Sequence, residues 1–322
     1  MIFLFLHFSF DNINYYNLID NKIENNYLPL IKILSYNVMI RYGGNVESVD
    51  IKKPEQTKEE IRIEANLDRI RHKLIVISGK GGVGKSTVAV NVAYGLALQG
   101  NKVGILDVDI HGPSIAKMLG IEGEKLQMNA NEEFPEPIKV MENLYALTIA
   151  TLVGNPDDPI IWRGPMKMGV IKQFMQDIRW PELDYLIVDS PPGTGDEPLS
   201  VVQILKNVDG SIIVSTPQDI ALLDARKTIK FSQKMNVPIL GIIENMSTFV
   251  CPHCGKKTDI FSGLGIEKAA KDFNIDVLGS IPIDVNIVKS GDTGKAFLKD
   301  NNTSTSAKEF QKIVSKISSK LN

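Results

Sequence analysis

Short apolar runs and longer periodic stretches alternate along most of the chain. Continuous runs of Val, Ile and Leu predict strands that are buried on both faces, as in a parallel sheet. Stretches in which apolar residues recur every third or fourth position predict helices. The strands are expected at residues 74–78, 102–107, 144–150, 185–189, 210–215, 238–243 and 277–281. The helices are expected at residues 86–98, 113–119, 167–178, 198–206, 220–235 and 266–273.

This alternation predicts one α/β domain over residues 73–322. Its sheet should be single, doubly wound and mostly parallel, with helices on both faces. Residues 51–72 are polar and helix-prone, with Ile63 and Leu67 among the apolar positions of one face. They predict a helix that leads into the domain and packs on its core.

The last segment, residues 306–321, also places apolar side chains at helical spacing. A final helix docked on the core is the simpler interpretation. The alternative is an amphipathic helix that binds a membrane surface. We favour the first, because the apolar face lacks the large aromatic residues that membrane-binding helices often use.

Residues 1–50 form an N-terminal extension, and no repeat or motif is evident in residues 1–45. Residues 1–10 are apolar, but the run is too short to span a bilayer and no basic segment precedes it. Two interpretations stay open. In the first, the extension is poorly ordered or results from a start codon assigned too early, with Met39 as the true start. In the second, it is a membrane-associating tail. We favour the first.

Composition narrows the class of protein. Among 322 residues, 43% are hydrophobic and 23% are charged, as in an ordinary soluble globular protein. A net charge of −2 argues against a broad nucleic-acid footprint, so no nucleic-acid or membrane partner is expected. The two cysteines do not form a disulfide framework in a chain of this length, which favours a reducing compartment such as the cytoplasm.

A phosphate-binding loop follows the first predicted strand of the domain. The loop consists of Gly79, Lys80, Gly81, Gly82, Val83, Gly84, Lys85, Ser86 and Thr87. It matches the full G-x-x-x-x-G-K-[ST] pattern between a strand and a helix, as the motif requires, and it indicates a sheet of the P-loop NTPase type. Backbone N–H groups would bind the phosphate oxygens of a nucleotide, Lys85 would reach the β- and γ-phosphates, and Ser86 would hold Mg²⁺.

Lys80 is a second lysine in this loop, at a position where most such loops have no charge. It has no evident task on the nucleotide of its own subunit. We expect it to reach across a dimer interface to the phosphate of the other subunit, with Lys80 and Lys85 both contributing to catalysis.

Three carboxylates end predicted strands on the side where an open α/β sheet binds its ligands. Asp107 and Asp109 follow one strand, and Asp189 ends another. We expect Asp189 and Asp109 to serve the Mg²⁺ site, and Asp109 and Asp107 to act in catalysis. A helix cap is the ordinary alternative for any one of them. Residues 190–197 hold two prolines and two glycines, and they predict either a sensor of the γ-phosphate or a rigid turn.

Both cysteines of the chain lie in one C-x-x-C, formed by Cys251 and Cys254. A thioredoxin-like redox pair is disfavoured, because a loop and not a helix follows. A structural zinc site normally needs four ligands, and one chain offers two thiolates and at most His253. Two chains related by a two-fold axis would bring four thiolates together, which fits a [4Fe–4S] cluster or a shared zinc ion. Ligand count alone does not separate iron from zinc.

Several strings resemble the deviant Walker A ATPases of the Mrp type, which are bacterial and archaeal iron–sulfur cluster carriers related to the eukaryotic cluster scaffold ATPases. The strings are residues 79–87, 107–114, 162–166, 189–197, 216–219, 244–247 and 251–254. The resemblance spans roughly residues 65–300, and the joint order of the strings makes it specific. It implies a homodimer that binds and hydrolyses ATP and holds a [4Fe–4S] cluster bridged by the C-x-x-C of both subunits. The expected partners are apo iron–sulfur proteins, which receive the cluster, and the cluster assembly machinery.

The resemblance also implies individual roles. Lys80 would be the signature lysine that contacts nucleotide across the dimer, and Asp109 would position water and Mg²⁺. Asn245 would read the adenine base, with Asp284 in a loop that flanks it. Some relatives have an additional N-terminal cysteine cluster, which this chain lacks, so a second stable cluster is not expected.

Two other functions compete with cluster transfer. A positioning ATPase of the MinD or ParA type shares the loop with Lys80 and would act on a membrane or on DNA. A nucleotide-gated electron donor like the nitrogenase iron protein ranks last, because those relatives place their cluster cysteines far apart in sequence.

Overall fold

The computed structural model describes residues 31–34, 37–42, 45–50, 57–109, 112–126, 134–151, 164–251, 253–261, 263, 265–301 and 303–321. The chain divides into two compact units, Met1–Gln56 and Thr57–Asn322. Residues 1–30, which include the apolar N-terminal run, lie outside the described residues.

The described part of the first unit is a small antiparallel sheet. It consists of β1 (Ile31–Leu34), β2 (Asn37–Tyr42) and β3 (Asn45–Asp50). β2 pairs with both neighbours, with Ile31 opposite Ile40 and Tyr42 opposite Asn45. The sequence pattern did not indicate these strands, because the extension lacks a clear alternation of apolar and polar positions.

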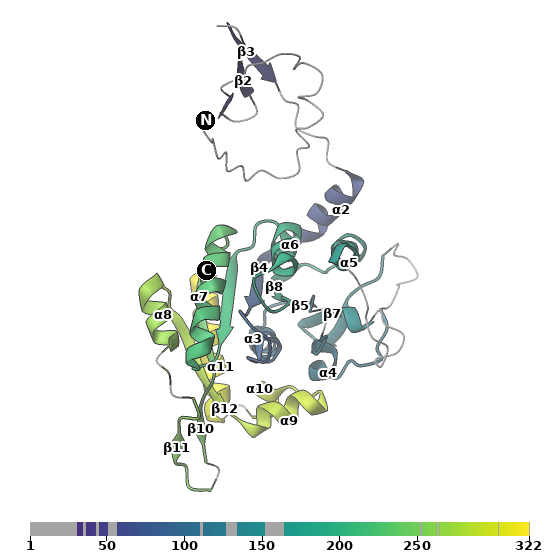
Figure 1. Ribbon diagram of the computed structural model, residues 1–322. Helices are drawn as coiled ribbons and strands as arrows, with labels where there is room; N and C mark the ends of the chain where they lie inside the picture. The colour runs from purple at the N-terminus through teal and green to yellow at the C-terminus, as the bar shows by residue number, and fades with distance from the viewer. Residues whose placement is uncertain are drawn as a thin grey trace. The chain divides into compact units, whose positions relative to one another are not determined.

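The second unit contains the α/β domain (Figure 1). Its strands are β4 (Ile70–Ile77), β5 (Val103–Asp107), β6 (Ile138–Met141), β7 (Leu144–Thr148), β8 (Leu183–Asp189), β9 (Gly210–Ser215), β10 (Ile239–Val250), β11 (Lys257–Thr258) and β12 (Val277–Ile283). Its helices are α2 (Lys58–Leu67), α3 (Lys85–Leu98), α4 (Ile115–Leu119), α5 (Gly164–Asp177), α6 (Asp196–Leu205), α7 (Asp219–Lys234), α8 (Gly265–Phe273), α9 (Val285–Thr293), α10 (Phe297–Asp300) and α11 (Thr305–Leu321). A short 3₁₀ turn covers Ile149–Thr151.

Nine strands of the described residues form one sheet in the order β11-β10-β9-β4-β8-β5-β7-β6, with β12 also paired to β10. Most neighbouring strands of this sheet are parallel. The exceptions lie at its two ends, where β6 is antiparallel to β7 and β11 is antiparallel to β10. The prediction of a single, mostly parallel, doubly wound sheet is therefore confirmed.

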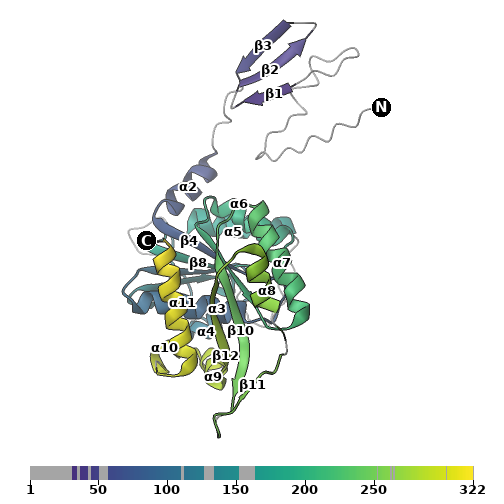
Figure 2. The same cartoon turned by 90° about the vertical axis from the view of Figure 1, so that its left-hand side faces the viewer.

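Alternate residues of the central strands face opposite layers. Leu74 and Val76 of β4 pack with the buried faces of α3, α4, α10 and α11. Ile75 and Ile77 pack with α2, α5, α6, α7 and α8 on the other face. Figures 1 and 2 show these two helical layers on either side of the sheet. Because both faces are covered, the strands need the continuous apolar runs seen in the sequence.

Helix α2 begins with a capping box in which Thr57 and Glu60 exchange hydrogen bonds, and it buries Ile63 and Leu67. Helix α11 buries Phe310, Ile313 and Ile317 in the core beside α3 and β12. Among the described helices, none combines the length and the apolar character needed to cross a bilayer.

Candidate functional site

The phosphate loop connects β4 to α3, as the pattern predicted. Gly82 and Gly84 adopt φ angles of 77° and 82°, which belong to the left-handed region that favours glycine. Gly84 also caps the N-terminus of α3. A side chain at this position would overlap the amide nitrogen of Asn245. The loop therefore depends on glycine at Gly84 for both conformation and space.

A pocket of about 230 Å³ opens above this loop. It is lined by Ser78, Gly81, Gly82, Gly84, Lys85, Ser86, Thr87, Asp109, Gly112, Ser114, Met118 and Pro192. The N-terminus of α3 faces it, so backbone N–H groups and the helix dipole favour an anionic ligand there. Ser114 and Pro192 belong to the segments 107–114 and 190–197 that were singled out from the sequence. Met118 was not, because nothing in its spacing indicates a role.

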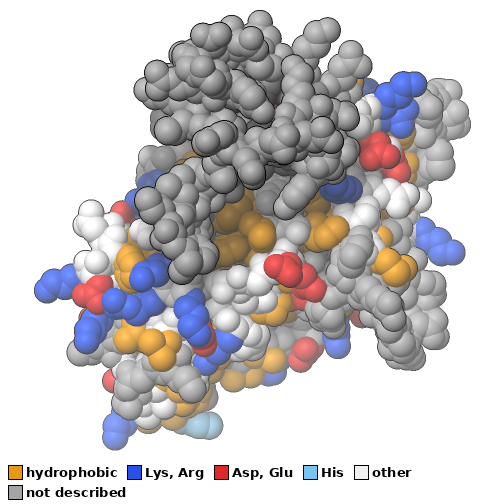
Figure 3. Space-filling view, turned by 45° about the horizontal axis from the view of Figure 1, so that its top comes forward, with side chains coloured by type: hydrophobic (Ala, Val, Ile, Leu, Met, Phe, Trp, Pro, Cys, Tyr) orange, Lys and Arg blue, Asp and Glu red, His pale blue; other side chains and the backbone are white. Residues whose placement is uncertain are grey.

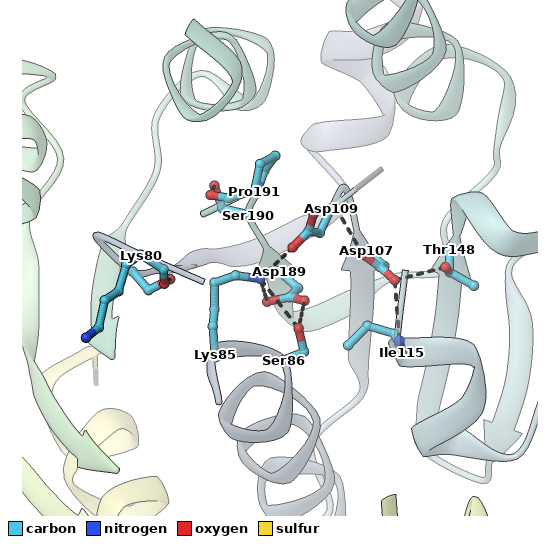
Figure 4. Close-up of polar contacts among 11 residues, drawn as sticks. Lys80, Lys85, Ser86, Asp107, Asp109, Ile115, Thr148, Asp189, Ser190 and Pro191 are labelled. Atoms are coloured by element: carbon cyan, nitrogen blue, oxygen red, sulfur yellow. Dashed lines mark hydrogen bonds and ion pairs between the residues drawn. The ribbon is translucent and has the colours of Figure 1, made fainter. Parts of the chain in front are cut away.

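Lys85, Ser86 and Asp189 form a compact polar cluster beside the pocket (Figure 4). Lys85 Nζ lies 2.6 Å from Asp189 Oδ1, and Ser86 Oγ donates a hydrogen bond to Asp189 Oδ2 at 2.5 Å. Burial raises the pKa of Asp189, while Lys85 and the Ser86 hydroxyl act to lower it. One carboxylate, Asp189, therefore contacts both Lys85 and Ser86, the residue that was expected to hold Mg²⁺.

Asp109 and Asp107 occupy different environments although they are two positions apart. Asp109 lines the pocket, is 14% exposed, and places Oδ2 at 3.6 Å from Lys85 Nζ. Asp107 is fully buried and does not belong to the pocket lining. Its Oδ1 accepts from the backbone N–H of Asp109 at 3.1 Å, and its Oδ2 accepts from Thr148 Oγ1 at 3.0 Å and from the N–H of Ile115 at 3.4 Å.

These contacts explain what Asp107 does in the fold. Burial, followed by the nearby Asp189 carboxylate, raises the pKa of Asp107 to about 8. The side chain holds both ends of the segment that begins at Asp109 and leads to α4 at Ile115. In this structure the contacts of Asp107 anchor the segment that presents Asp109. The expected part of Asp107 in catalysis stays a prediction.

Lys80 lies apart from this cluster. Its Nζ donates a hydrogen bond to Oε1 of Gln218 at 2.9 Å, and Figure 4 shows the side chain extending away from Lys85 and Asp189. Gln218 follows β9 and precedes α7, so it too lies at the carboxyl end of a strand. Ser78 Oγ donates to the carbonyl of Lys80 at 2.9 Å and supports the start of the loop.

Gly79, Val83, Asn245 and Asp284 were expected among the nucleotide-binding residues and lie outside the pocket lining. A Cβ at Gly79 would lie 2.6 Å from Cβ of Asp224 in α7, so this glycine permits close packing. Asn245 Nδ2 donates to the carbonyl of Val83 at 2.9 Å. Asp284 caps α9 by accepting from the N–H of Asn286 at 2.9 Å.

The segment after Asp189 closes one side of the pocket. The N–H of Gly193 donates to the carbonyl of Ser78 at 2.8 Å, and Pro192 lines the pocket. α6 begins at Asp196 and contains the last two residues of this segment. The segment therefore links the end of β8 to the residue before the phosphate loop.

The two cysteines lie at the tip of the hairpin formed by β10 and β11, away from the pocket in sequence. Both are free thiols; Cys251 is half-buried and Cys254 is exposed. The N–H of Cys251 donates to the carbonyl of Lys256, and the N–H of Gly255 donates to the carbonyl of Cys251. The backbone N–H of Cys254, then that of His253, and then the Cys254 side chain lower the pKa of Cys251. Such a tight turn with a more acidic thiol suits a metal-binding pair.

On the face drawn in Figure 3, basic and acidic side chains of the described residues are interspersed. The pocket lining includes two hard oxygen donors, the hydroxyl of Ser86 and the carboxylate of Asp109, and the buried Asp189 carboxylate accepts a hydrogen bond from that hydroxyl. Oxygen donors of this kind suit Mg²⁺.

Comparison with known proteins agrees with these features. A family model described as ParA, NUBPL iron-transfer P-loop NTPase, matches residues 69–318. An iron-sulfur cluster carrier protein of Methanocaldococcus jannaschii is 46% identical over 265 residues, which cover 82% of this chain and 90% of the relative. A cytosolic Fe-S cluster assembly factor NUBP1 homolog of Caenorhabditis elegans is 46% identical over 266 residues, which cover 81% of this chain and 84% of the relative.

Two solved structures share the fold. A nucleotide-binding protein of Archaeoglobus fulgidus in complex with ADP has a TM-score of 0.65 and 38% identity, covering 74% of this chain and 92% of its own. The cell division ATPase MinD of Pyrococcus furiosus has a TM-score of 0.55 at 22% identity, covering 77% and 99%, which shows the fold alone. The resemblance inferred from the sequence is confirmed, and the chain belongs to the NUBPL iron-transfer P-loop NTPase family.

Proposed function

We propose that this protein binds and hydrolyses ATP and carries a [4Fe–4S] cluster, bridged between two subunits, to apo iron–sulfur proteins. The observation that supports it most directly is the pair of free thiols, Cys251 and Cys254, at the tip of a hairpin in a chain of this family. Relatives with 46% identity are named as a cluster carrier and a cluster assembly factor.

The cysteine count supports a homodimer. The whole chain contains two cysteines, and a [4Fe–4S] cluster is commonly held by four thiolates. Two hairpins related by a two-fold axis supply four. The exposed position of Cys254 leaves the cluster accessible to the thiolates of a recipient, which can replace the carrier thiolates one at a time. The cluster is the cargo of this reaction, and its acceptors are apoproteins and other parts of the assembly machinery.

The pocket residues support ATP hydrolysis to ADP and phosphate. Mg²⁺ would be held by Ser86 with help from Asp109 and Asp189, and it would neutralise charge on the phosphates. Lys85 is poised at the same place, since it already lies 2.6 Å from Asp189. Asp109 lines the pocket and is the carboxylate best placed to orient an attacking water. We assign Lys80 to the nucleotide of the partner subunit, and Asn245 and Asp284 to the surroundings of the base.

Hydrolysis acts on cluster transfer through the dimer. A nucleotide that binds the closed dimer more tightly than the open one shifts the population toward closure, and loss of the γ-phosphate reverses the shift. Residues 190–197 connect the pocket to β8 and α6, and they would sense that loss. Free thiols and a labile cluster both require a reducing compartment, so we assign the activity to the cytoplasm.

Anaerobic reconstitution tests this proposal. The purified chain is loaded with iron and sulfide, and iron, sulfide, zinc and the visible charge-transfer band are measured after gel filtration. We expect a dimer with about one [4Fe–4S] cluster, because four thiolates hold one cluster. The Cys251→Ala/Cys254→Ala double variant should retain the fold and bind no cluster. Equal cluster content in the two proteins, or zinc in place of iron in anaerobically purified protein, would overturn the assignment.

A positioning ATPase acting on a membrane or on DNA remains the alternative that the shared fold suggests. The interspersed charges of the face in Figure 3 do not favour a polyanion partner. Co-sedimentation with anionic liposomes or plasmid DNA, in the presence and absence of ATP, discriminates between the two. Nucleotide-dependent sedimentation without cluster binding would support the alternative.

A further inference from the structure

The side chain of Asn245 joins the phosphate loop to the strand that leads to the cysteines. Its Nδ2 donates to the backbone carbonyl of Val83 at 2.9 Å. Asn245 is 7% exposed and Val83 is 2% exposed, so water competes little for this bond. Gly84 leaves the space that the amide occupies, because a Cβ there would overlap Nδ2. The contact fixes the turn of the loop directly before Lys85.

Asn245 also lies where β10 changes partners. Up to Glu244 the strand pairs with β9 on one side and β12 on the other. The register with β12 then shifts between Asn245 and Phe249, and Phe249 and Val250 pair with β11 of the cysteine hairpin. Between these segments Met246 adopts a φ of 57°, which a residue with a Cβ seldom does.

The backbone at Met246 is a candidate for the point at which β10 changes between two conformations. A residue held in the left-handed region persists there only while its surroundings require it. The hydrogen bond from Asn245 to Val83 is one such requirement, because it fixes the residue just before Met246. Loss or displacement of that bond would allow the backbone at Met246 to relax, and the hairpin beyond it would change its angle.

We propose that Asn245 is a positioning residue that couples the nucleotide state of the phosphate loop to Cys251 and Cys254 within one subunit. Phosphate binding to the loop N–H groups shifts the Val83 carbonyl, and the Asn245 amide either follows it or releases it. β10 ends at Val250 and Cys251 follows directly, so the change reaches the thiols along a single strand. The inference rests on the proposed function for the role of these thiols as cluster ligands.

Thiol reactivity of the cluster-free protein measures the coupling without any cluster. Alkylation of Cys251 and Cys254 by iodoacetamide is followed by mass spectrometry, with no nucleotide, with saturating MgADP, and with a saturating non-hydrolysable ATP analogue. In the wild type we expect nucleotide to change the rate roughly fivefold or more, the lower end of typical allosteric coupling. In Asn245→Ala the rate should be the same in all three states.

Nucleotide affinity is measured in parallel, so that saturation is assured for each variant. Asn245→Ala should bind nucleotide about fivefold more weakly, which corresponds to about 1 kcal/mol for one hydrogen bond. Asn245→Asp keeps the volume of the side chain but cannot donate to Val83 when ionised, so it serves if the alanine variant does not fold. Thr248→Ala is the matched control, because it lies on β10 closer to the cysteines and should keep the wild-type response.

Two results would overturn the proposal. The first is a wild-type protein whose thiols react equally with and without nucleotide. The second is an Asn245→Ala protein, saturated with nucleotide, that keeps the full change in rate, whether or not its preference for ATP over GTP has changed. If no cluster can be reconstituted but nucleotide still changes the thiol reactivity in wild type and not in the Asn245 variants, the carrier function would be wrong. The coupling between the phosphate loop and the cysteines would still hold.

Discussion

Lys80 donates a hydrogen bond to Gln218 at 2.9 Å, while Lys85 in the same loop reaches Asp189 at 2.6 Å. The two lysines therefore serve separate groups within one subunit. Lys85 and its carboxylate are buried together, whereas Lys80 is half-buried and paired with a neutral amide. An amide holds a lysine more weakly than a carboxylate does, so Lys80 can leave its partner at small cost.

Replacing Lys80 tests whether this side chain acts on nucleotide. Lys80→Ala should lower the rate of ATP hydrolysis on the order of 100-fold, as expected for the loss of a preorganised charge at the transition state. Cluster transfer should fall with it. The thermal midpoint should change little, because the side chain contributes one hydrogen bond to a neutral partner. Steady-state ATPase and apoprotein reactivation assays check both activities.

Lys227→Ala is the matched control for Lys80→Ala. Lys227 is 69% exposed on α7 and lies 3.7 Å from Asp224, close in sequence to the segment that holds Gln218. It removes the same charge from the same region, and ATP hydrolysis should stay near the wild-type rate. If Lys80→Ala retains full ATPase and transfer activity, the proposed role of Lys80 across the dimer fails, even though the family membership stands.

Asp107 should make stability depend on pH. Its pKa is about 8 in the folded chain and near 3.8 when unfolded, so between these values the folded chain binds the additional proton. The free energy of unfolding should therefore fall as the pH rises from about 4 to about 8. Asp107→Asn removes this titration. Relative to wild type, the variant should gain stability across that window by up to a few kcal/mol, at about 1.4 kcal/mol for each pKa unit.

Urea unfolding of both proteins at several pH values measures this difference. Asp68→Asn, at the exposed C-terminus of α2, is the control and should run parallel to wild type. A constant offset between wild type and Asp107→Asn from pH 4 to pH 8 would show that Asp107 keeps its charge in the folded chain. That outcome would mean that Asp107 is an ionised carboxylate in the folded chain, as Mg²⁺ binding or catalysis would require.

Strong local patterns predicted most of the domain. The apolar runs at β4, β5, β8 and β9 were recognised because strands covered on both faces need them. β10 was expected to end at residue 243 and continues to Val250, since its outer half contains polar residues and is held by pairing with β11 and β12. Helices α9 and α10 are short and were not predicted, because they bury few side chains and have little periodicity.

The site was predictable where a motif fixes the backbone and less so where a contact joins distant segments. The loop at Gly84 and Lys85 follows from its own sequence. The bond from Asn245 to Val83 and the bond from Lys80 to Gln218 join segments more than a hundred positions apart. Asp107 and Asp109 show the same limit. Asp107 ends β5 and is fully buried beside Thr148, whereas Asp109, two positions further on, lines the pocket, and their spacing alone does not distinguish them.

Gly84 should tolerate no side chain. Gly84→Ala places a Cβ against the Asn245 amide and forces an L residue to a φ of 82°. We expect the free energy of unfolding to fall by roughly 1–3 kcal/mol, the usual range for a strained backbone, and nucleotide binding to weaken. Gly81→Ala is the control for stability alone, since a Cβ there meets no atom within 4 Å. Equal unfolding midpoints for the two variants would contradict the proposed packing.

Cys251 should react at a lower pH than an ordinary thiol. The backbone N–H groups of Cys254 and His253 are the main causes of its lowered pKa, and both remain when the Cys254 side chain is removed. In Cys254→Ala, Cys251 is the only thiol of the chain, so iodoacetamide alkylation reports on it alone. We expect the folded protein to react several-fold faster near pH 7 than the same protein unfolded in urea, where the thiol pKa is close to 9.0.

The pH profile decides whether the hairpin itself tunes this thiol. Because the thiolate is the reactive form, the midpoint of the alkylation rate gives the pKa of Cys251 directly. A lower midpoint in the folded state would mean that the turn from Cys251 to Gly255 prepares a metal-binding thiolate before any cluster arrives. Identical midpoints for the folded and unfolded chains would contradict this, because the backbone N–H groups would then have no effect on the charge of the sulfur.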